Sequence, residues 1–290
     1  PIAEIDLGLQ ALRRRDTDFR LMIENQDELG ELGETFNQMM VEIKEMLLAG
    51  AVQQCLISAE CPTIKGFESL IYNRMAADVG GDYADMFELP DQRYLIVLGD
   101  VTGHGVSSSI LTAMVKAAVF RFALHDTDLK TILQSLSNMI FELLQRRKLM
   151  TFCAMILDGR TGRFYTANAG HPFPLLCSPD GRIRQIEHAA LPLGVSLKRS
   201  IYEVVENEIA PGEMLMLYTD GITEGTDPSG QEFGIERVEK VIAAKLSEGI
   251  EAVRNRLLED FFSHYQRHEL DDDLTFVLVR RLPASAESPE

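Results

Sequence analysis

Two stretches near the start of the chain carry apolar residues at the spacing of a helical seam. Ile2, Ile5, Leu9 and Leu12 follow one another in steps of three and four, and a second series does the same: Leu29, Leu32, Phe36, Met39, Ile43 and Met46. Such steps are typical of heptad a and d positions. They predict two helices, joined by a polar connector. The second helix is expected to continue through residues 49–61 and to end at Pro62.

From Phe67 onward the pattern changes to short β-rich runs and longer amphipathic stretches. The strands come mostly in hairpin succession and the helices come in blocks, which indicates an α+β fold with antiparallel sheets. The runs predict strands at 67–73, 83–89, 93–99, 151–158, 163–170, 182–187, 200–209, 213–219 and 274–281. They predict helices at about 107–124, 129–145, 236–246 and 250–267.

The net charge of the chain argues against two classes of binding partner, nucleic acids and anionic membranes. The 290 residues have a formal net charge of −17, so the basic surface that binds nucleic acid is missing and an anionic membrane would repel the chain. No 18-residue stretch is apolar throughout, so we expect no membrane-spanning segment here. Because the chain begins with proline, we expect it to be part of a longer protein.

Carboxylates recur where apolar runs meet glycine-containing loops. Asp100 ends the run before "VTGHG", Asp82 follows two glycines, and Asp220 precedes Gly221. A fourth group stands at the head of the last strand: Asp271, Asp272 and Asp273. Each motif alone is an ordinary turn or solvated loop. Gathered together, however, such acids would repel one another unless a cation sat among them, and Mg²⁺ and Mn²⁺ prefer this kind of oxygen ligand.

The four motifs, in this order, resemble the metal-dependent protein phosphatases (PPM, the protein phosphatase 2C superfamily), and most of all their bacterial SpoIIE/RsbU-like branch. The matching stretches include "YNRMAADVGGDYAD", "LIVLGDVTGHGVSSSILTAMV", "YTANAGHPFPLL", "LYTDGITEG" and "DDDLTFVLV". The resemblance covers about residues 50–281. It implies a β-sandwich of two antiparallel sheets flanked by helices, and a serine/threonine phosphatase.

The resemblance also implies a site with two Mn²⁺ or Mg²⁺ ions and no protein nucleophile. Asp100 matches the acid that bridges both ions, the carbonyl of Val101 matches the backbone ligand, and Asp82 matches an acid that holds one ion directly or through water. Asp220 and Asp272 match the ligands that close the site. Asp273 stands where relatives often carry Asn, so it ranks below Asp272. Asp85 is expected to have a structural or secondary role.

The chain departs from the wider superfamily at two points. The phosphate-gripping arginine of eukaryotic relatives is replaced by Ala77, and Arg74 is nearby but out of register. We therefore expect phosphate to be held mainly by the metals. The relatives' "DGH" histidine is displaced to His104, which we interpret as a loop residue, and we interpret His171 as structural. The acid that protonates the leaving group stays unassigned.

The proline-led helix, connector and "DELGELGETFNQM" resemble the HAMP linker domain of bacterial transmembrane receptors. HAMP domains are parallel four-helix coiled coils, so the resemblance implies a homodimer, a membrane-spanning sensor upstream, and a cytoplasmic position for this part of the protein. The expected organisation is a HAMP-like domain at 1–48, a linker helix at 49–62, a phosphatase domain at 63–282 and a polar tail at 283–290. The SpoIIE/RsbU-like resemblance implies that the substrate is a small phosphorylated regulator, often an anti-sigma-factor antagonist.

Two other functions remain open from the sequence. "GGDY" is faintly similar to the signature of nucleotidyl cyclases that follow HAMP domains, although those enzymes lack the "TDG" and "DDDLT" acids and alternate strands with helices. A dimeric scaffold without catalysis is the other alternative. All four acid motifs are present, which favours an enzyme.

Overall fold

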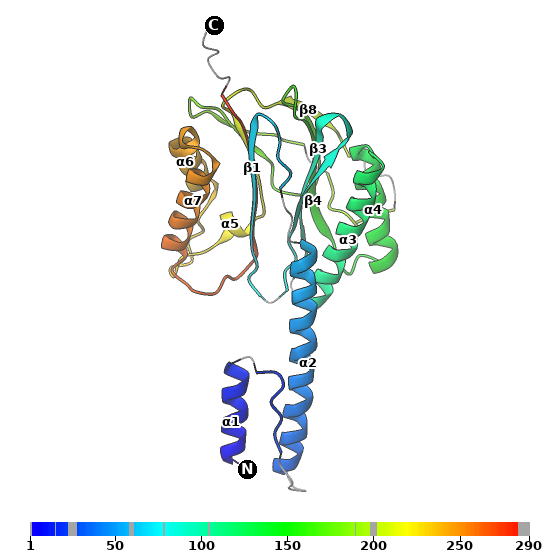
Figure 1. Ribbon diagram of the computed structural model, residues 1–290, viewed down its shortest axis with the longest axis vertical. Helices are drawn as coiled ribbons and strands as arrows, with labels where there is room; N and C mark the ends of the chain where they lie inside the picture. The colour runs from blue at the N-terminus through cyan, green and yellow to red at the C-terminus, as the bar shows by residue number, and fades with distance from the viewer. Residues whose placement is uncertain are drawn as a thin grey trace. The chain divides into compact units, whose positions relative to one another are not determined.

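The computed structural model describes residues 2–14, 16–22, 28–57, 61–77, 79–103, 105–188, 190–197 and 202–283. The chain divides into two compact units, residues 1–55 and 56–290. Figure 1 shows both, and each is described by itself. The predicted boundaries at residues 48 and 62 lie on either side of this division.

The first unit is built around two helices, α1 (Ile2–Arg13) and α2 (Glu28–Ile57), and the latter runs on past residue 55. The connector folds back on α2, because the side chain of Asn37 accepts a hydrogen bond from the Leu21 amide at 2.8 Å and donates one to the Leu21 carbonyl at 2.9 Å. Leu21, Phe36 and Met40 form its small buried core.

The predicted heptad seam is only partly buried within the single chain. Phe36 is buried, whereas Leu9, Leu32 and Met39 are 49%, 47% and 38% exposed. The expected helix over 49–61 is described as far as Ile57, and residues 58–60 lie outside the described residues. Apolar seam positions that one chain leaves exposed are available to another helix.

The second unit contains two five-stranded antiparallel sheets. Sheet A has the order β1-β10-β9-β6-β7 and sheet B the order β2-β3-β4-β5-β8. The strands of sheet A are β1 (Phe67–Arg74), β6 (Leu175–Cys177), β7 (Ile183–Gln185), β9 (Met214–Tyr218) and β10 (Leu274–Arg281). Those of sheet B are β2 (Tyr83–Leu89), β3 (Arg93–Val101), β4 (Met150–Asp158), β5 (Arg163–Ala169) and β8 (Val205–Glu208).

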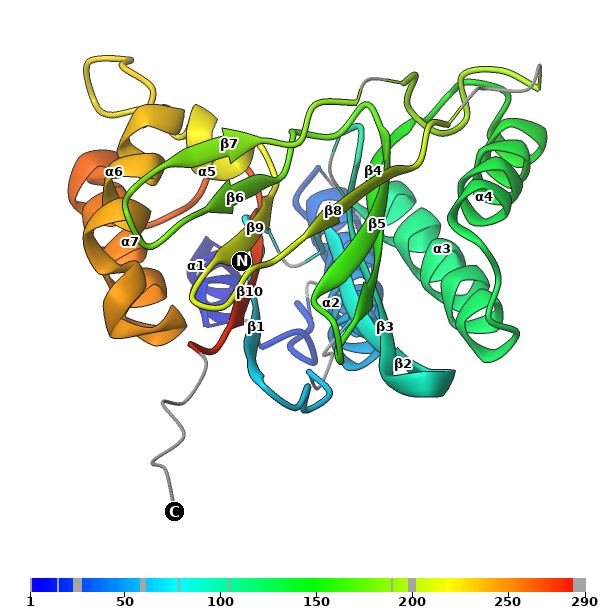
Figure 2. The ribbon, with the colours of Figure 1, turned by 90° about the horizontal axis from the view of Figure 1, so that it is seen from above.

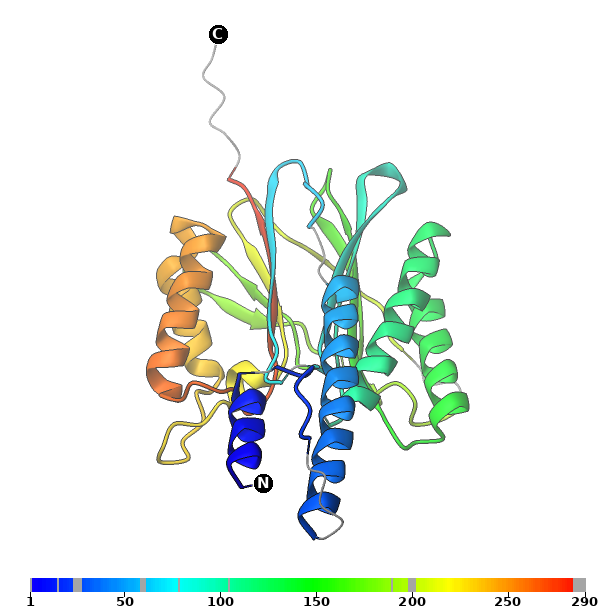
Figure 3. The same ribbon diagram turned by 60° about the horizontal axis from the view of Figure 1, so that its bottom comes forward.

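Helices cover the outer face of each sheet, so the unit has four layers (Figures 2 and 3). On sheet B lie α3 (Val106–Leu124) and α4 (Leu129–Leu144). On sheet A lie α6 (Ile235–Lys245) and α7 (Ile250–Tyr265). Three shorter elements lie between these along the chain: α5 (Gly221–Glu224) follows β9, the 3-10 turn η1 (Pro90–Gln92) joins β2 to β3, and the 3-10 turn η2 (Leu246–Glu248) joins α6 to α7.

The central strands are apolar without interruption because both of their faces are buried. Along β3, Leu95 and Val97 pack toward α3 and α4, whereas Ile96 and Leu98 pack between the two sheets. Successive side chains of a strand point to opposite faces, so one continuous apolar run serves two cores. This confirms the expected α+β sandwich of two antiparallel sheets flanked by helices, and it is not the alternating strand-helix arrangement that the cyclase alternative required.

Three expectations need correction. Residues 200 and 201 of the strand predicted over 200–209 lie outside the described residues. In the rest of that range the strand is confined to β8, because Tyr202 and Val204 pack against the helical side of sheet B. Strand β6 was not predicted because prolines surround its three residues, and α5 was not predicted because "TDG" is typical of a turn.

By length and composition α3 is apolar enough to cross a membrane, but its inward residues Leu111, Val115 and Val119 are buried against sheet B.

Candidate active site

The four acidic motifs lie at one end of the sandwich. In sheet A the end of β1 pairs with the start of β10 (Arg74 with Leu274), next to the end of β9. In sheet B the start of β2 pairs with the end of β3 (Tyr83 with Gly99). The hydroxyl of Thr219 donates to Asp82 Oδ2 at 2.9 Å and so joins the two ends across the sheets. Segments far apart in sequence thereby bring their carboxylates together.

A hollow of about 310 Å³ opens at this end of the sandwich. Three of the predicted ligands line it, namely Asp100, Val101 and Asp272, together with Gly81 and Gly103. Its other lining residues are Ala76, Ala77, Val79, Leu270, Asp271 and Asp273. Asp82 and Asp220 are not among the lining residues.

Asp82 and Asp220 nevertheless interact electrostatically with Asp100, which lines the hollow. Burial, followed by repulsion from Asp220, Asp272 and Asp273, raises the pKa of Asp100 to about 7, and a hydrogen bond with Asp82 opposes that rise. Asp82 is 2% exposed, and burial together with the charges of Asp100 and Asp273 raises its pKa well above the usual range. Repulsion among buried acids is the electrostatic signature of a site that favours a cation.

The groups present fit a hard divalent cation by their chemistry. All the predicted donors are oxygens, as Mg²⁺ and Mn²⁺ prefer. The chain also leaves room beside them, since a Cβ on Gly81 would stand 3.0 Å from the Val101 carbonyl oxygen and 3.2 Å from Asp100 Oδ1. Within the part of the chain that the structure describes, no three Asp, Glu, His or Cys side chains already form a closed ligand cluster. Mutual repulsion gives a physical reason for that open arrangement.

Arg74 and His171, two candidates for holding phosphate or moving a proton, do not line the hollow. The guanidinium of Arg74 stacks 4.6 Å from the ring centre of Phe262 and does not line the hollow, whereas Ala77 does. His104 lies outside the described residues. His171 is buried with its Nδ1 2.8 Å from the Thr151 hydroxyl, and burial lowers its pKa to about 3, so it is neutral.

Asp85 is engaged away from the hollow. Its carboxylate forms an ion pair with Lys116 of α3 at 3.0 Å and accepts the hydroxyl of Tyr83 at 3.3 Å. It therefore ties β2 to α3.

Sequence reasoning missed the groups that brace the turn between β3 and α3. The ammonium of Lys148 donates to the Thr102 carbonyl at 2.6 Å and to the Ser108 hydroxyl at 2.8 Å. Ser108 in turn donates to the Gly103 carbonyl at 2.5 Å. No local pattern marks Lys148, because its partners lie about 40 residues earlier and only the β3–β4 pairing brings them close.

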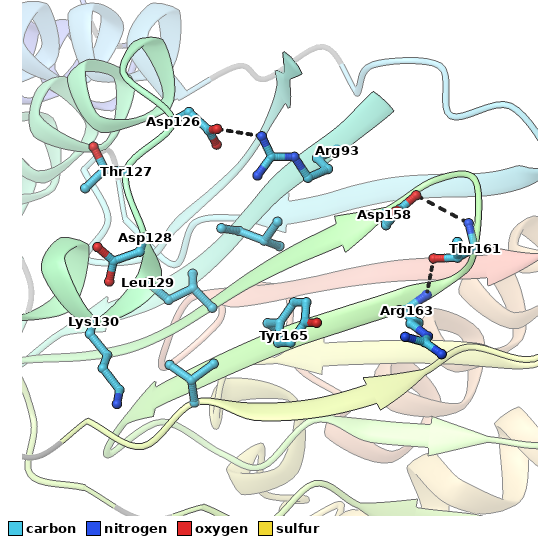
Figure 4. A pocket seen from close by; sticks show the side chains of 12 residues that line it. Arg93, Asp126, Thr127, Asp128, Leu129, Lys130, Asp158, Thr161, Arg163 and Tyr165 are labelled. Atoms are coloured by element: carbon cyan, nitrogen blue, oxygen red, sulfur yellow. Dashed lines mark hydrogen bonds and ion pairs between the residues drawn. The ribbon is translucent and has the colours of Figure 1, made fainter. Parts of the chain in front are cut away.

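A larger hollow of about 470 Å³ lies at the opposite end of β3, where Arg93 begins the strand (Figure 4). Its acids are already engaged: Asp126 pairs with Arg93 at 2.5 Å, Asp158 pairs with Arg160 at 3.0 Å, and Asp128 caps α4. It therefore lacks the unbalanced carboxylates that distinguish the Asp100 hollow.

Comparison with known proteins agrees with this geometry. The profile of the family described as Stage II sporulation protein E (SpoIIE) matches residues 90–282. Protein IcfG of Synechocystis is 23% identical over 97% of this chain and 51% of its own length. Phosphoserine phosphatase RsbU of Bacillus subtilis is 25% identical over 86% of this chain and 73% of its own.

Among solved structures, the SiaA-PP2C domain of Pseudomonas aeruginosa superposes with a TM-score of 0.72 at 21% identity, over 84% of this chain and 98% of its own. This likeness extends the sandwich fold to a protein of low sequence identity. The chain spans about half the length of IcfG. Because the family profile covers about two thirds of the chain, including Asp100, Asp220 and Asp272, the chain belongs to the SpoIIE family.

Proposed function

We propose that the chain is a metal-dependent serine/threonine protein phosphatase. The observation that carries this proposal is the convergence of four acidic motifs on one end of the sandwich, where Asp100 is surrounded by Asp220, Asp272 and Asp273. A scaffold without catalysis would gain nothing from an arrangement that destabilises the empty site. The printed name of the relative RsbU, a phosphoserine phosphatase, supports the same reaction.

The proposed ligands are the carboxylates of Asp82, Asp100, Asp220 and Asp272 and the carbonyl of Val101, holding two Mn²⁺ or Mg²⁺ ions. When bound, such a pair supplies a water of lowered pKa and a positive field for the phosphoryl oxygens. The chain's own part is to orient the donors. Thr219 holds one oxygen of Asp82, and the β3–β4 ladder fixes Asp100 opposite Thr151.

No arginine of the described chain lines the hollow, so we propose that the substrate's phosphate is bound mainly by the cations. The hollow is open and small, which suits a phosphorylated side chain presented by another protein. We propose a small phosphorylated regulator of the anti-sigma-factor-antagonist type, as the SpoIIE/RsbU resemblance implies.

We further propose that the first unit is a HAMP-like dimerisation domain, joined to an upstream membrane sensor, which controls the phosphatase through α2. The exposure of Leu9, Leu32 and Met39 supports a second copy as the partner, because these residues belong to the predicted seam. An isolated seam of this length is marginal in water, so dimerisation of the fragment alone is expected to be weak.

The decisive test is phosphate release from serine and threonine phosphopeptides, with GTP turnover measured beside it. We expect release in Mn²⁺ or Mg²⁺, none after exhaustive chelation, and recovery when the metal is returned. Full activity in the chelated protein would exclude this mechanism, and GTP turnover without phosphate release from peptides would favour the cyclase alternative. Incubation with the phosphoproteome of the host would then identify the substrate.

A further inference from the structure

Asp273 was the alternative metal ligand, but its carboxylate is directed at the backbone. Oδ1 accepts the amide of Ala76 at 2.8 Å. Oδ2 accepts the amides of Gly81 at 2.8 Å and Asp82 at 3.2 Å. The residue is 6% exposed, so these three bonds form in a largely dehydrated place where charge-assisted hydrogen bonds are strong.

The surrounding backbone approaches Asp273 so closely that only glycine fits at two positions. A Cβ on Gly80 would stand 2.3 Å from Asp273 Oδ2, and a Cβ on Gly221 would stand 2.0 Å from the Asp273 carbonyl oxygen. Gly80 precedes Asp82 in the "GGD" motif, and Gly221 directly follows Asp220. One residue therefore contacts the segments that deliver two proposed ligands, and it is bonded in sequence to the third, Asp272.

An asparagine at this position could not make the same set of bonds. An amide has one acceptor oxygen and a nitrogen that only donates, so it cannot accept backbone N–H groups on both sides. The carboxylate of this chain can. The same engagement leaves Asp273 less suited to a metal, because both of its oxygens already accept hydrogen bonds.

We propose that Asp273 is a positioning residue, whose carboxylate binds the amides of Ala76, Gly81 and Asp82 and so fixes Asp82 relative to Asp220 and Asp272 before any cation arrives. The inference rests on the proposed two-metal site. It assigns Asp273 to the support of that site and Asp272 to its ligands. Supporting groups of this kind change metal affinity without touching the metal.

The test compares Asp273→Asn with Asp272→Asn, using Mn²⁺ titration by calorimetry and hydrogen exchange of the amides at 76, 81 and 82. For Asp273→Asn we expect an apparent Mn²⁺ dissociation constant raised about 10- to 100-fold, together with faster exchange at one or more of those amides. For Asp272→Asn we expect loss of Mn²⁺ binding with the amide protection retained. Asp126→Asn, which removes an equal charge from the ion pair with Arg93 at the opposite end of β3, is the control and should bind Mn²⁺ within about fivefold of the wild type.

Two results would overturn the proposal: unchanged exchange and unchanged affinity in Asp273→Asn, or lost binding with unchanged exchange, which would make Asp273 a ligand. If Asp273→Asn does not fold, Gly80→Ala tests the same contact from the other side, because its new Cβ must displace Asp273 Oδ2. It should then show the same weaker binding and faster exchange. A wild type that binds no Mn²⁺ would refute the proposed function instead, while amide exchange would still decide whether Asp273 holds the loop.

Discussion

At the scale of single residues, Asp100 shows how a site and its fold oppose each other. Its carboxyl lies at the end of a buried strand and faces three further acids. Without a cation, repulsion among these carboxylates destabilises the fold. The proposed reaction gives a reason for the chain to keep these acids despite that cost. Removing one charge should therefore raise the stability of the metal-free domain and lower the rate of phosphate release.

We predict that Asp100→Asn and Asp220→Asn abolish phosphate release while leaving the domain folded. In chelator at pH 8, Asp100→Asn should raise the free energy of unfolding by about 1–3 kcal/mol, because it removes a penalised charge. Turnover assays and thermal unfolding check the two effects. Substantial activity in the Asp100 variant would show that this carboxylate is not a ligand.

His171 provides a separate prediction about pH. In the folded chain its pKa is about 3, below the value of 6.5 for an unperturbed histidine. Between these two pH values the unfolded chain binds a proton at His171 and the folded chain does not. Stability from this residue is complete above pH 6.5 and is lost as pH falls toward 3. At pH 5 the loss amounts to about 2 kcal/mol.

His171→Gln should accordingly flatten the fall in unfolding free energy between pH 7 and pH 5, whatever its effect at neutral pH. Denaturant titrations of both proteins at several pH values measure the difference in slope. Identical slopes would mean that the pKa of His171 is the same in the folded and the unfolded chain.

At the scale of elements, the turn between β3 and α3 depends on Lys148, which lies in the loop just before β4. Lys148→Met removes the bonds to Thr102 and Ser108, so we predict that phosphate release falls about 10- to 100-fold. The domain should lose about 1–2 kcal/mol of stability. Kinetics at saturating Mn²⁺ measure the effect, and Lys130→Met, at the rim of the other hollow, is the control. Equal rates in both variants would contradict a role for Lys148.

The elements themselves were largely predictable, because the central strands and the amphipathic helices carry strong local patterns. The predicted strands at 83–89 and 274–281 agree with β2 and β10 residue for residue. Sequence patterns gave wrong predictions where burial or strand pairing depends on residues far away in the sequence, as in β6 and at Tyr202 and Val204. The acids of the site were likewise visible as strand-end motifs, whereas Lys148 and the partners of Asp273 depend on contacts between distant segments.

At the scale of the whole molecule, the question is whether the first unit controls the second or only tethers it. The helix α2 runs from Glu28 to Ile57 and carries no proline, and Gly50 is the one glycine between the end of the seam at Met46 and Ile57. An unbroken helix can pass a rotation to the domain that it enters. In the sequence it is followed by β1 and the "GGD" segment, where small displacements of Asp82 matter, because productive geometry tolerates only about half an ångström.

We therefore predict that the helical phase at Gly50 sets the rate of phosphate release. One inserted residue turns the following helix by about 100° and should change turnover, whereas seven inserted residues, about two turns, nearly restore the phase and should restore the rate. A fragment that begins at Pro62, and so keeps the buried Ile64, gives the rate without control. Light scattering establishes the oligomeric state of each protein. If all of them turn over equally at saturating Mn²⁺ with the same oligomeric state, the helix is a tether and the coupling hypothesis is wrong.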